Sequence, residues 1–180
     1  MATKPIPTPD ELRQLLNYDP DTGLFTWKIR DAKWFKNPKY AKNWNTRWAG
    51  TPALGAIHFR SRGVAGGYKS GNILGNVYLS HRVAWAHHYG EWPEQIIDHV
   101  NRDTSDNRIC NLREANHTQS AANRATPSSN TSGFKGVSKV SGSGKWRVTF
   151  SIGTFDTIDD AKNAYKKYHS MIYGEFACFD

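Results

Sequence analysis

The first amphipathic pattern of the chain lies near its beginning and predicts a short helix. Apolar residues there repeat with the spacing of one helical face: Leu12, Leu15 and Leu16. Thr8 and Glu11 have the spacing of a capping box, in which two side chains bind free backbone amides at a helix start. Pro9 suits the first turn, so we expect a helix from residue 9 to about Tyr18.

Alternating apolar and polar positions after this helix predict strands. Residues 19–23 have the composition of a turn, and residues 24–30 then alternate in strand fashion. The glycine-rich residues 63–71 separate two further strand candidates, the second at residues 76–79. Residues 31–50 are rich in Lys, Asn and Trp and follow neither period, so we expect irregular chain there.

The middle of the chain has the pattern of a helix, a β-hairpin and a second helix. Its first three elements are a helix over residues 81–89 that Ser80 can cap, and two short apolar strands at residues 96–100 and 108–112. A polar loop joins the two strands, which favours antiparallel pairing. Asn116 suits the N-cap of the next helix, from His117 to about Arg124.

The last third of the chain has the pattern of a small separate domain. A hairpin of residues 134–140 and 145–152 precedes a helix that begins near Asp156, with Thr157 and Asp160 at capping spacing. The whole pattern is that of an α+β protein. We expect an N-terminal helix and β-rich basic extension at 1–75, a hairpin-and-helix core at 76–126, a flexible linker at 127–133 and a sheet-plus-helix domain at 134–180.

Composition restricts the location and the metal chemistry. The chain has 180 residues, no apolar run long enough for a membrane span, and no apolar signal segment at its start, which together predict a cytoplasmic protein with no membrane partner. Its two cysteines, Cys110 and Cys178, lack the paired neighbours that zinc clusters use, so we expect no structural zinc. Both cysteines are interpreted as small buried apolar residues.

Positive charge is concentrated outside the middle of the chain. The net charge is +8, of which residues 1–75 carry +7, residues 76–129 carry −1 and residues 130–180 carry +2. Basic flanks around an acidic centre are typical of a protein that binds a polyanion and holds a cation. Charge alone is equally compatible with an ordinary solvated surface.

An Asp–His pair closes the first strand of the predicted hairpin. Hydrolysis of a phosphodiester needs a base for water and a cation for the phosphate charge, and His99 and Asp98 supply an imidazole and a hard oxygen ligand. Asn111 follows twelve positions after His99 and can fix its orientation without adding charge. Neighbours on a strand point to opposite faces, so a shared site requires the strand to end or bend here. The alternative is that the pair forms a surface turn.

Longer stretches around this pair resemble phage-type HNH endonucleases of the ββα-metal fold, including homing endonucleases. The matching stretches are residues 19–27, 79–85, 97–101 and 105–113, followed by the helix to Arg124. The resemblance implies that His99 is the general base, Asp98 a ligand of one divalent ion, commonly Mg²⁺ with Mn²⁺ as an alternative, and Asn111 the central orienting residue. It also implies a double-stranded DNA substrate and, for a phage protein, the cytoplasm of a bacterial host.

The resemblance leaves the second metal ligand open. The family draws it, as Asn or His, from the helix, but Ser120 occupies the position where close relatives have Asn. His117 and Asn123, one turn to either side, are the substitutes. The resemblance further implies that Arg82 and Arg113 contact DNA. His81, next to Arg82, also matches the family, and the alternative to a functional role for it is packing.

The end of the chain resembles an APETALA2/ERF-type DNA-binding domain. The matching stretches are residues 133–138, 144–148, 153–157 and 173–177. The resemblance implies that Lys135, Trp146 and Arg147 face DNA, although Trp146 can instead pack against Tyr165. The segment between residues 148 and 153 is shorter than the family's, so we expect a two-stranded sheet with fewer base contacts.

These patterns together predict a monomeric, metal-dependent DNA endonuclease that hydrolyses phosphodiester bonds, of the homing or nicking kind. The alternative is a non-catalytic DNA-binding protein derived from an HNH nuclease, with Ser120 and the shortened sheet as marks of lost activity.

Overall fold

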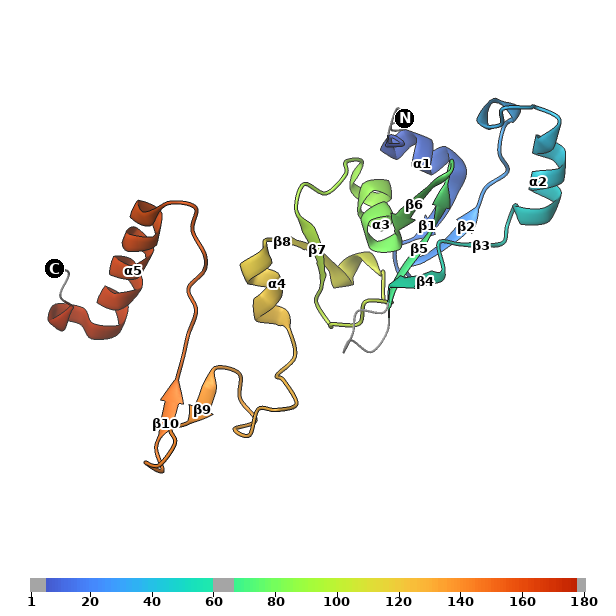
Figure 1. Ribbon diagram of the computed structural model, residues 1–180. Helices are drawn as coiled ribbons and strands as arrows, with labels where there is room; N and C mark the ends of the chain where they lie inside the picture. The colour runs from blue at the N-terminus through green and yellow to red at the C-terminus, as the bar shows by residue number, and fades with distance from the viewer. Residues whose placement is uncertain (1–5, 60–66, 178–180) are drawn as a thin grey trace. The chain divides into compact units, whose positions relative to one another are not determined.

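The protein is described here as a computed structural model, which covers residues 6–59 and 67–177 (Figure 1). It has the predicted α+β composition, with short helices and small antiparallel sheets. The chain divides into two compact units, residues 1–123 and 124–180, and each is described by itself.

The first unit begins with helix α1 (Pro9–Leu15) and a sheet of strands β1 (Leu16–Asp19), β2 (Leu24–Trp27) and β3 (Pro52–Ala53). The capping box is confirmed, because the amide of Glu11 donates to Thr8 Oγ1 and the amide of Thr8 to the Glu11 carboxylate. The expected helix end at Tyr18 is wrong. Leu16 takes extended backbone and starts β1, which pairs along its whole length with β2.

Residues 31–50 are not irregular, contrary to the expectation. They contain the 3₁₀ helix η1 (Ala32–Trp34) and helix α2 (Tyr40–Trp48). Helix α2 has no buried residue, but Tyr40, Ala41, Trp44 and Trp48 have the spacing of one helical face, so the sequence did carry a periodic signal here that the expectation of irregular chain overlooked.

A second sheet contains β4 (Ala56–Phe59), β5 (Tyr68–Ile73) and β6 (Asn76–Leu79), and helix α3 (Ser80–Tyr89) contacts β5 and β6. The expected glycine-rich break is wrong from Tyr68 onward, because those residues form β5; residues 63–66 lie outside the described part. Ser80 is not the cap of α3. It is the first residue of that helix, and its hydroxyl donates to the carbonyl of Leu54.

The hairpin-and-helix segment consists of β7 (Ile96–His99), the 3₁₀ helix η2 (Ile109–Asn111), β8 (Leu112–Ala115) and α4 (His117–Asn123). The expected second strand at 108–112 is displaced, because the amide of Asn111 closes a turn on the carbonyl of Arg108 and β8 begins only at Leu112. In the same turn Cys110 is exposed, not buried as expected, and Cys178 lies outside the described residues. Asn116 caps α4 as predicted, since its Oδ1 accepts from the amide of Gln119.

One hydrophobic core joins the N-terminal elements to the hairpin. Its buried members come from α1, the first two sheets, α3 and both strands of the hairpin: Leu12, Leu15, Leu16, Phe25, Ala53, Leu54, Ile73, Val83, Ala84, Ala86, Ile97 and Leu112. The N-terminal extension therefore packs as part of the same body as the hairpin.

The second unit contains a hairpin of β9 (Val137–Lys139) and β10 (Trp146–Val148), helix α5 (Ile158–Tyr173) and the 3₁₀ helix η3 (Gly174–Phe176). Its sheet has two strands, as expected, each shorter than predicted. The cap of α5 is confirmed, because Thr157 Oγ1 accepts from the amide of Asp160. Trp146 and Tyr165 are both about half exposed, at 53% and 54%.

Candidate metal and active site

The carboxylate of Asp98 is the meeting point of β7, β8 and α4. Asn123 Nδ2 donates to Asp98 Oδ2 at 3.0 Å, and Ser120 Oγ lies 3.4 Å from Oδ1. Arg113, the partner of Asp98 in the strand register, donates to Oδ2 from Nε and Nη2 at 2.9 and 2.8 Å. Asp98 is only 8% exposed, because side chains from β8 and α4 cover its carboxylate.

His99, the last residue of β7, has a different set of neighbours. Its ring is 4% exposed and lies 5.2 Å from the ring of His81 and 6.0 Å from that of Tyr68. Burial is the main cause that lowers the pKa of His99, and the hydrogen bond to Asn107 and the charge of Asp98 partly oppose it. The imidazole is therefore neutral near pH 7 and able to accept a proton.

Asn111 holds the loop that follows His99. Its Oδ1 accepts from the amide of Asn101 at 2.9 Å, and its Nδ2 donates to the carbonyl of Asp106 at 2.8 Å. Its own carbonyl accepts from the amide of Val100. The Asn111 side chain therefore joins the backbone of Asn101 to that of Asp106, near the two ends of the loop. Both hydrogen bonds are made to backbone and neither to the imidazole of His99.

Asn107 is a site residue to which the sequence analysis gave no role. Its Oδ1 lies 3.3 Å from His99 Nε2, and the residue is 2% exposed. Its Nδ2 has no hydrogen-bond partner among the described residues. Spacing alone carries no signal for this contact, because it depends on how the loop between β7 and β8 folds back over the imidazole.

The turn between β1 and β2 supports the loop that carries Asn107. Tyr18 Oη donates to the carbonyl of Asn107 at 2.8 Å, and the carbonyl of Pro20 accepts from the amide of Ile109 at 3.0 Å. Gly23 lies against the same backbone, with φ +70°, and a Cβ there would lie 2.5 Å from the amide nitrogen of Arg108. Elements from the first 25 residues therefore position a neighbour of the imidazole.

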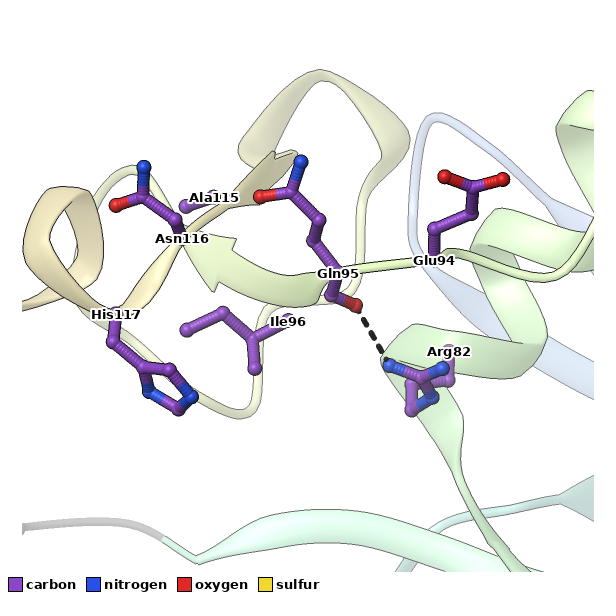
Figure 2. Close-up of a pocket in the computed structure, with 7 residues that line it drawn as sticks. All are labelled: Arg82, Glu94, Gln95, Ile96, Ala115, Asn116 and His117. Carbon is purple, nitrogen blue, oxygen red and sulfur yellow. Dashed lines mark hydrogen bonds between the residues drawn. The ribbon is translucent and has the colours of Figure 1, made fainter. Parts of the chain in front are cut away.

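Arg82 and His117 line a surface pocket whose lining does not include Asp98 (Figure 2). The pocket is lined by Arg82, Glu94, Gln95, Ile96, Ala115, Asn116 and His117. The Arg82 guanidinium donates to the carbonyls of Gln95 and Pro93 at 3.0 and 2.8 Å, which ties α3 to the segment before β7. The contacts at Asp98 come from Ser120 and Asn123 of α4, not from His117.

The three predicted DNA-facing residues of the second unit are on its surface. Trp146 and Arg147 are exposed in β10, and Lys135 donates from Nζ to the carbonyl of Arg124 at 3.0 Å.

The two Asp98 oxygens and the Ser120 hydroxyl are oxygen ligands of the kind that a hard divalent cation takes, and Mg²⁺ commonly binds one or two protein oxygens and keeps several waters. Asn123 turns its amide nitrogen, not its oxygen, toward this carboxylate, and that Nδ2 also donates to the carbonyl of His99. Within residues 6–59 and 67–177, no group of three or more His, Cys, Asp or Glu side chains gathers as a metal cluster. A cation here would therefore depend on a single carboxylate.

Comparison with known families gives one match, which covers the site except for Asn123. Residues 78–122 match the family of HNH endonucleases, a segment that runs from β6 through most of α4 and contains Asp98, His99, Asn107 and Asn111. It spans about a quarter of the chain and shows a relation to nucleases for that segment. No curated protein and no solved structure matches the chain.

The match does not reach the second unit, so the resemblance of that unit to APETALA2/ERF domains stays a prediction. In the part of the chain that the structure describes, no helix has both the length and the apolar composition of a membrane span.

Proposed function

We propose that this protein is a metal-dependent endonuclease that hydrolyses phosphodiester bonds in double-stranded DNA. The observation that carries the proposal is the convergence of Ser120 and Asn123 from α4 on the buried carboxylate of Asp98. The next residue along β7 is His99, whose imidazole has its own set of neighbours and a pKa lowered by burial. The match of this segment to HNH endonucleases supports the same chemistry.

Asp98 would hold one divalent ion, Mg²⁺ or Mn²⁺, together with Asn123 and with Ser120 directly or through water. Such an ion neutralises charge that develops on the phosphate and on the leaving oxygen. Asn123 is favoured over His117 as the second ligand because it lies beside the carboxylate, and it would bind the ion through Oδ1 once its amide has turned to bring that oxygen, in place of Nδ2, toward Asp98. Arg113 is about half exposed, at 49%, so its side chain can leave Asp98 and bind a phosphate instead.

His99 would act as the general base. Its imidazole accepts a proton from the water whose oxygen attacks phosphorus, and the bond from phosphorus to the leaving oxygen breaks. A ring proton on Nε2 would fit the contact with Asn107, because Oδ1 can only accept a hydrogen bond, and Nδ1 would then be the atom that accepts the proton from water. Asn111 would keep the loop after His99 in place.

The test is cleavage of supercoiled plasmid by the purified chain with Mg²⁺ or Mn²⁺. His99→Ala is expected to slow the reaction by at least about 100-fold, the usual contribution of a positioned base. His88→Ala, a substitution of an exposed histidine on α3, serves as the matched control and is expected to cleave like the wild type. Equal cleavage by the wild type and His99→Ala would contradict the proposal.

A second candidate is a DNA-binding protein without catalysis. It is favoured by the ion pair of Asp98 with Arg113, which occupies Oδ2 with a cationic side chain, and by a serine at position 120. Gel shifts that persist in EDTA, together with intact plasmid under every divalent ion tried, would select this candidate.

A further inference from the structure

The segment between β2 and β3 is an insertion that projects from one sheet. We call residues 28–51 the basic insertion. Its two ends are joined at the sheet, because Trp27 donates its amide to the carbonyl of Thr51 at 3.0 Å and accepts from the amide of Gly50 at 2.7 Å. The chain therefore leaves and re-enters the sheet at one point, with η1 and α2 between.

Arg30 fixes α2 to the base of the insertion. Its guanidinium lies 4.5 Å from the Trp27 ring and 3.9 Å from the Trp44 ring, which is cation–π geometry on both sides. Asn45 adds two reciprocal hydrogen bonds of 2.9 Å with the backbone of Arg30. Arg30 is only 9% exposed, so this contact is a structural anchor, and α2 is held in a defined place.

The outer surface of the basic insertion is cationic. It holds seven of the 24 Lys and Arg residues against one acidic residue, Asp31. Lys28 donates to the carbonyl of Arg13 and Lys33 to Gln14 Oε1, so both are directed back toward α1. The remaining exposed cations are Lys36, Lys39, Lys42 and Arg47. Across residues 6–59 and 67–177, the carboxylates that form ion pairs are Asp10, Asp98 and Asp106, and none of them pairs with the insertion.

Helix α2 adds to this positive potential and contributes nothing to the core. Its first turn has no acidic residue, and Lys39 stands at the N-cap, where the helix dipole is already positive. The positive charge of Lys39 at the positive end of the helix dipole raises the free energy of the protein without a ligand, and a bound anion would lower it. Tyr40 and Trp48 are 62% and 41% exposed beside these cations, a mixture of aromatic and cationic groups that suits nucleic acid.

We propose that the exposed face of the basic insertion binds the phosphate backbone of duplex DNA without reading its sequence. Within the first unit, α2 lies at the opposite end from β7 and α4, so this surface is separate from the Asp98 carboxylate (Figure 1). It would lengthen the contact along the duplex and supply affinity. The choice of DNA as the polyanion rests on the proposed function.

The test replaces Lys36, Lys39 and Lys42 together by glutamine in the full chain, with the three Lys→Arg changes as the charge-preserving control. Binding to a short mixed-sequence DNA duplex is measured in EDTA over a range of salt concentrations, so that cleavage plays no part. Each lost phosphate contact lowers the slope of log affinity against log salt by about 0.9, so the glutamine variant should lose about 2.7. Its affinity at about 0.1 M salt should fall on the order of 100-fold.

The outcomes separate this proposal from the proposed function. If the glutamine variant has the same salt slope and affinity as the arginine variant, the proposed DNA-binding surface is wrong. Tighter binding of the wild type to duplex RNA than to duplex DNA would also overturn the proposal. Neither variant should unfold at a lower midpoint than the wild type, because the three side chains are exposed, and loss of the Lys39 charge at the N-cap of α2 can only raise the midpoint of the glutamine variant. Absence of cleavage by the wild type would overturn the nuclease proposal and leave the binding result in force.

Discussion

At the scale of single residues, the imidazole of His99 is defined by what surrounds it. Asn107 contacts Nε2, His81 and Tyr68 lie beside the ring, and the buried position keeps the ring neutral. Asp98, one residue earlier, has none of these partners and bonds with β8 and α4 instead. The sequence therefore predicted the Asp98–His99 pair. It could not predict that the two side chains have different neighbours, because those neighbours are set by tertiary contacts.

Replacement of Asn107 tests its role in orienting the base. Asn107→Ala removes the acceptor for Nε2–H, and loss of such an orienting partner typically costs about 10- to 100-fold in activity. Asn107→Asp keeps an acceptor and adds a negative charge that raises the pKa of His99. We expect this variant to retain most of the maximal rate, with the acidic limb of its kcat/KM profile at higher pH. Unchanged kcat in Asn107→Ala would show that the contact is not used.

The buried His81 makes stability depend on pH. Its ring is 5% exposed, and burial lowers its pKa to about 3, with smaller contributions from His99 and Arg82. Between that value and its unfolded pKa of about 6.5, the unfolded state binds the proton more strongly. The contribution of the neutral His81 ring to the free energy of unfolding is therefore fully present above a pH of about 6.5. It is lost as the pH falls, by up to about 1.4 kcal/mol per pH unit.

Urea unfolding at several pH values below 6.5 measures this dependence. His87 and His99 also have lowered pKa values and add to it in the same direction. His81→Phe should flatten the dependence, whereas His88→Gln on the exposed face should leave it unchanged. Equal slopes in the wild type and His81→Phe would show that His81 is not the buried neutral group described here.

At the scale of elements, the predicted caps of three helices are confirmed, whereas the predicted cap of α3 and the irregular chain expected at residues 31–50 are wrong. Thr8, Asn116 and Thr157 mark the starts of α1, α4 and α5 because their side-chain oxygens bind local amides, which spacing reveals. Helix α2 is held by Arg30 between Trp27 and Trp44, a tertiary contact that the spacing of residues along the chain does not reveal. Strand β8 was displaced because Asn111 binds the loop and closes a turn before it.

The turn between β1 and β2 offers a test by paired glycine substitutions. Gly23 and Gly50 both have positive φ, +70° and +78°, but only at Gly23 would a Cβ meet backbone, at 2.5 Å. Alanine at either position carries the strain of positive φ, about 1 kcal/mol. Gly23→Ala should lose clearly more stability than Gly50→Ala by urea unfolding and should also slow cleavage, since it displaces the loop with Asn107. Equal losses of stability would contradict the close approach of the turn.

At the scale of the molecule, the segment that matches HNH endonucleases shares its core with the N-terminal elements. Leu12, Leu15 and Leu16 are fully buried in the same cluster as Val83 and Ile97. Composition and pattern predicted an extension and a core as neighbouring regions, but a shared core cannot be deduced from periodicity, which describes each element alone.

Truncation tests this dependence. A fragment of residues 76–126 should show no cooperative thermal unfolding, because about 50 residues without these leucines bury too little apolar surface. A fragment of residues 1–126 should unfold cooperatively, since it retains the whole cluster. Cooperative unfolding of the shorter fragment would show that the hairpin and α4 are self-sufficient.

The metal site that we propose consists of Asp98 and α4, in the segment that also contains His99. Anomalous diffraction from crystals of the protein grown with Mn²⁺ is its sharpest test. We expect a peak within ligand distance of the Asp98 carboxylate and of an oxygen from Asn123 or Ser120, with the Arg113 guanidinium displaced from Asp98. If Asp98 remains paired with Arg113 in saturating Mn²⁺ and no peak lies beside it, the proposed metal site is wrong.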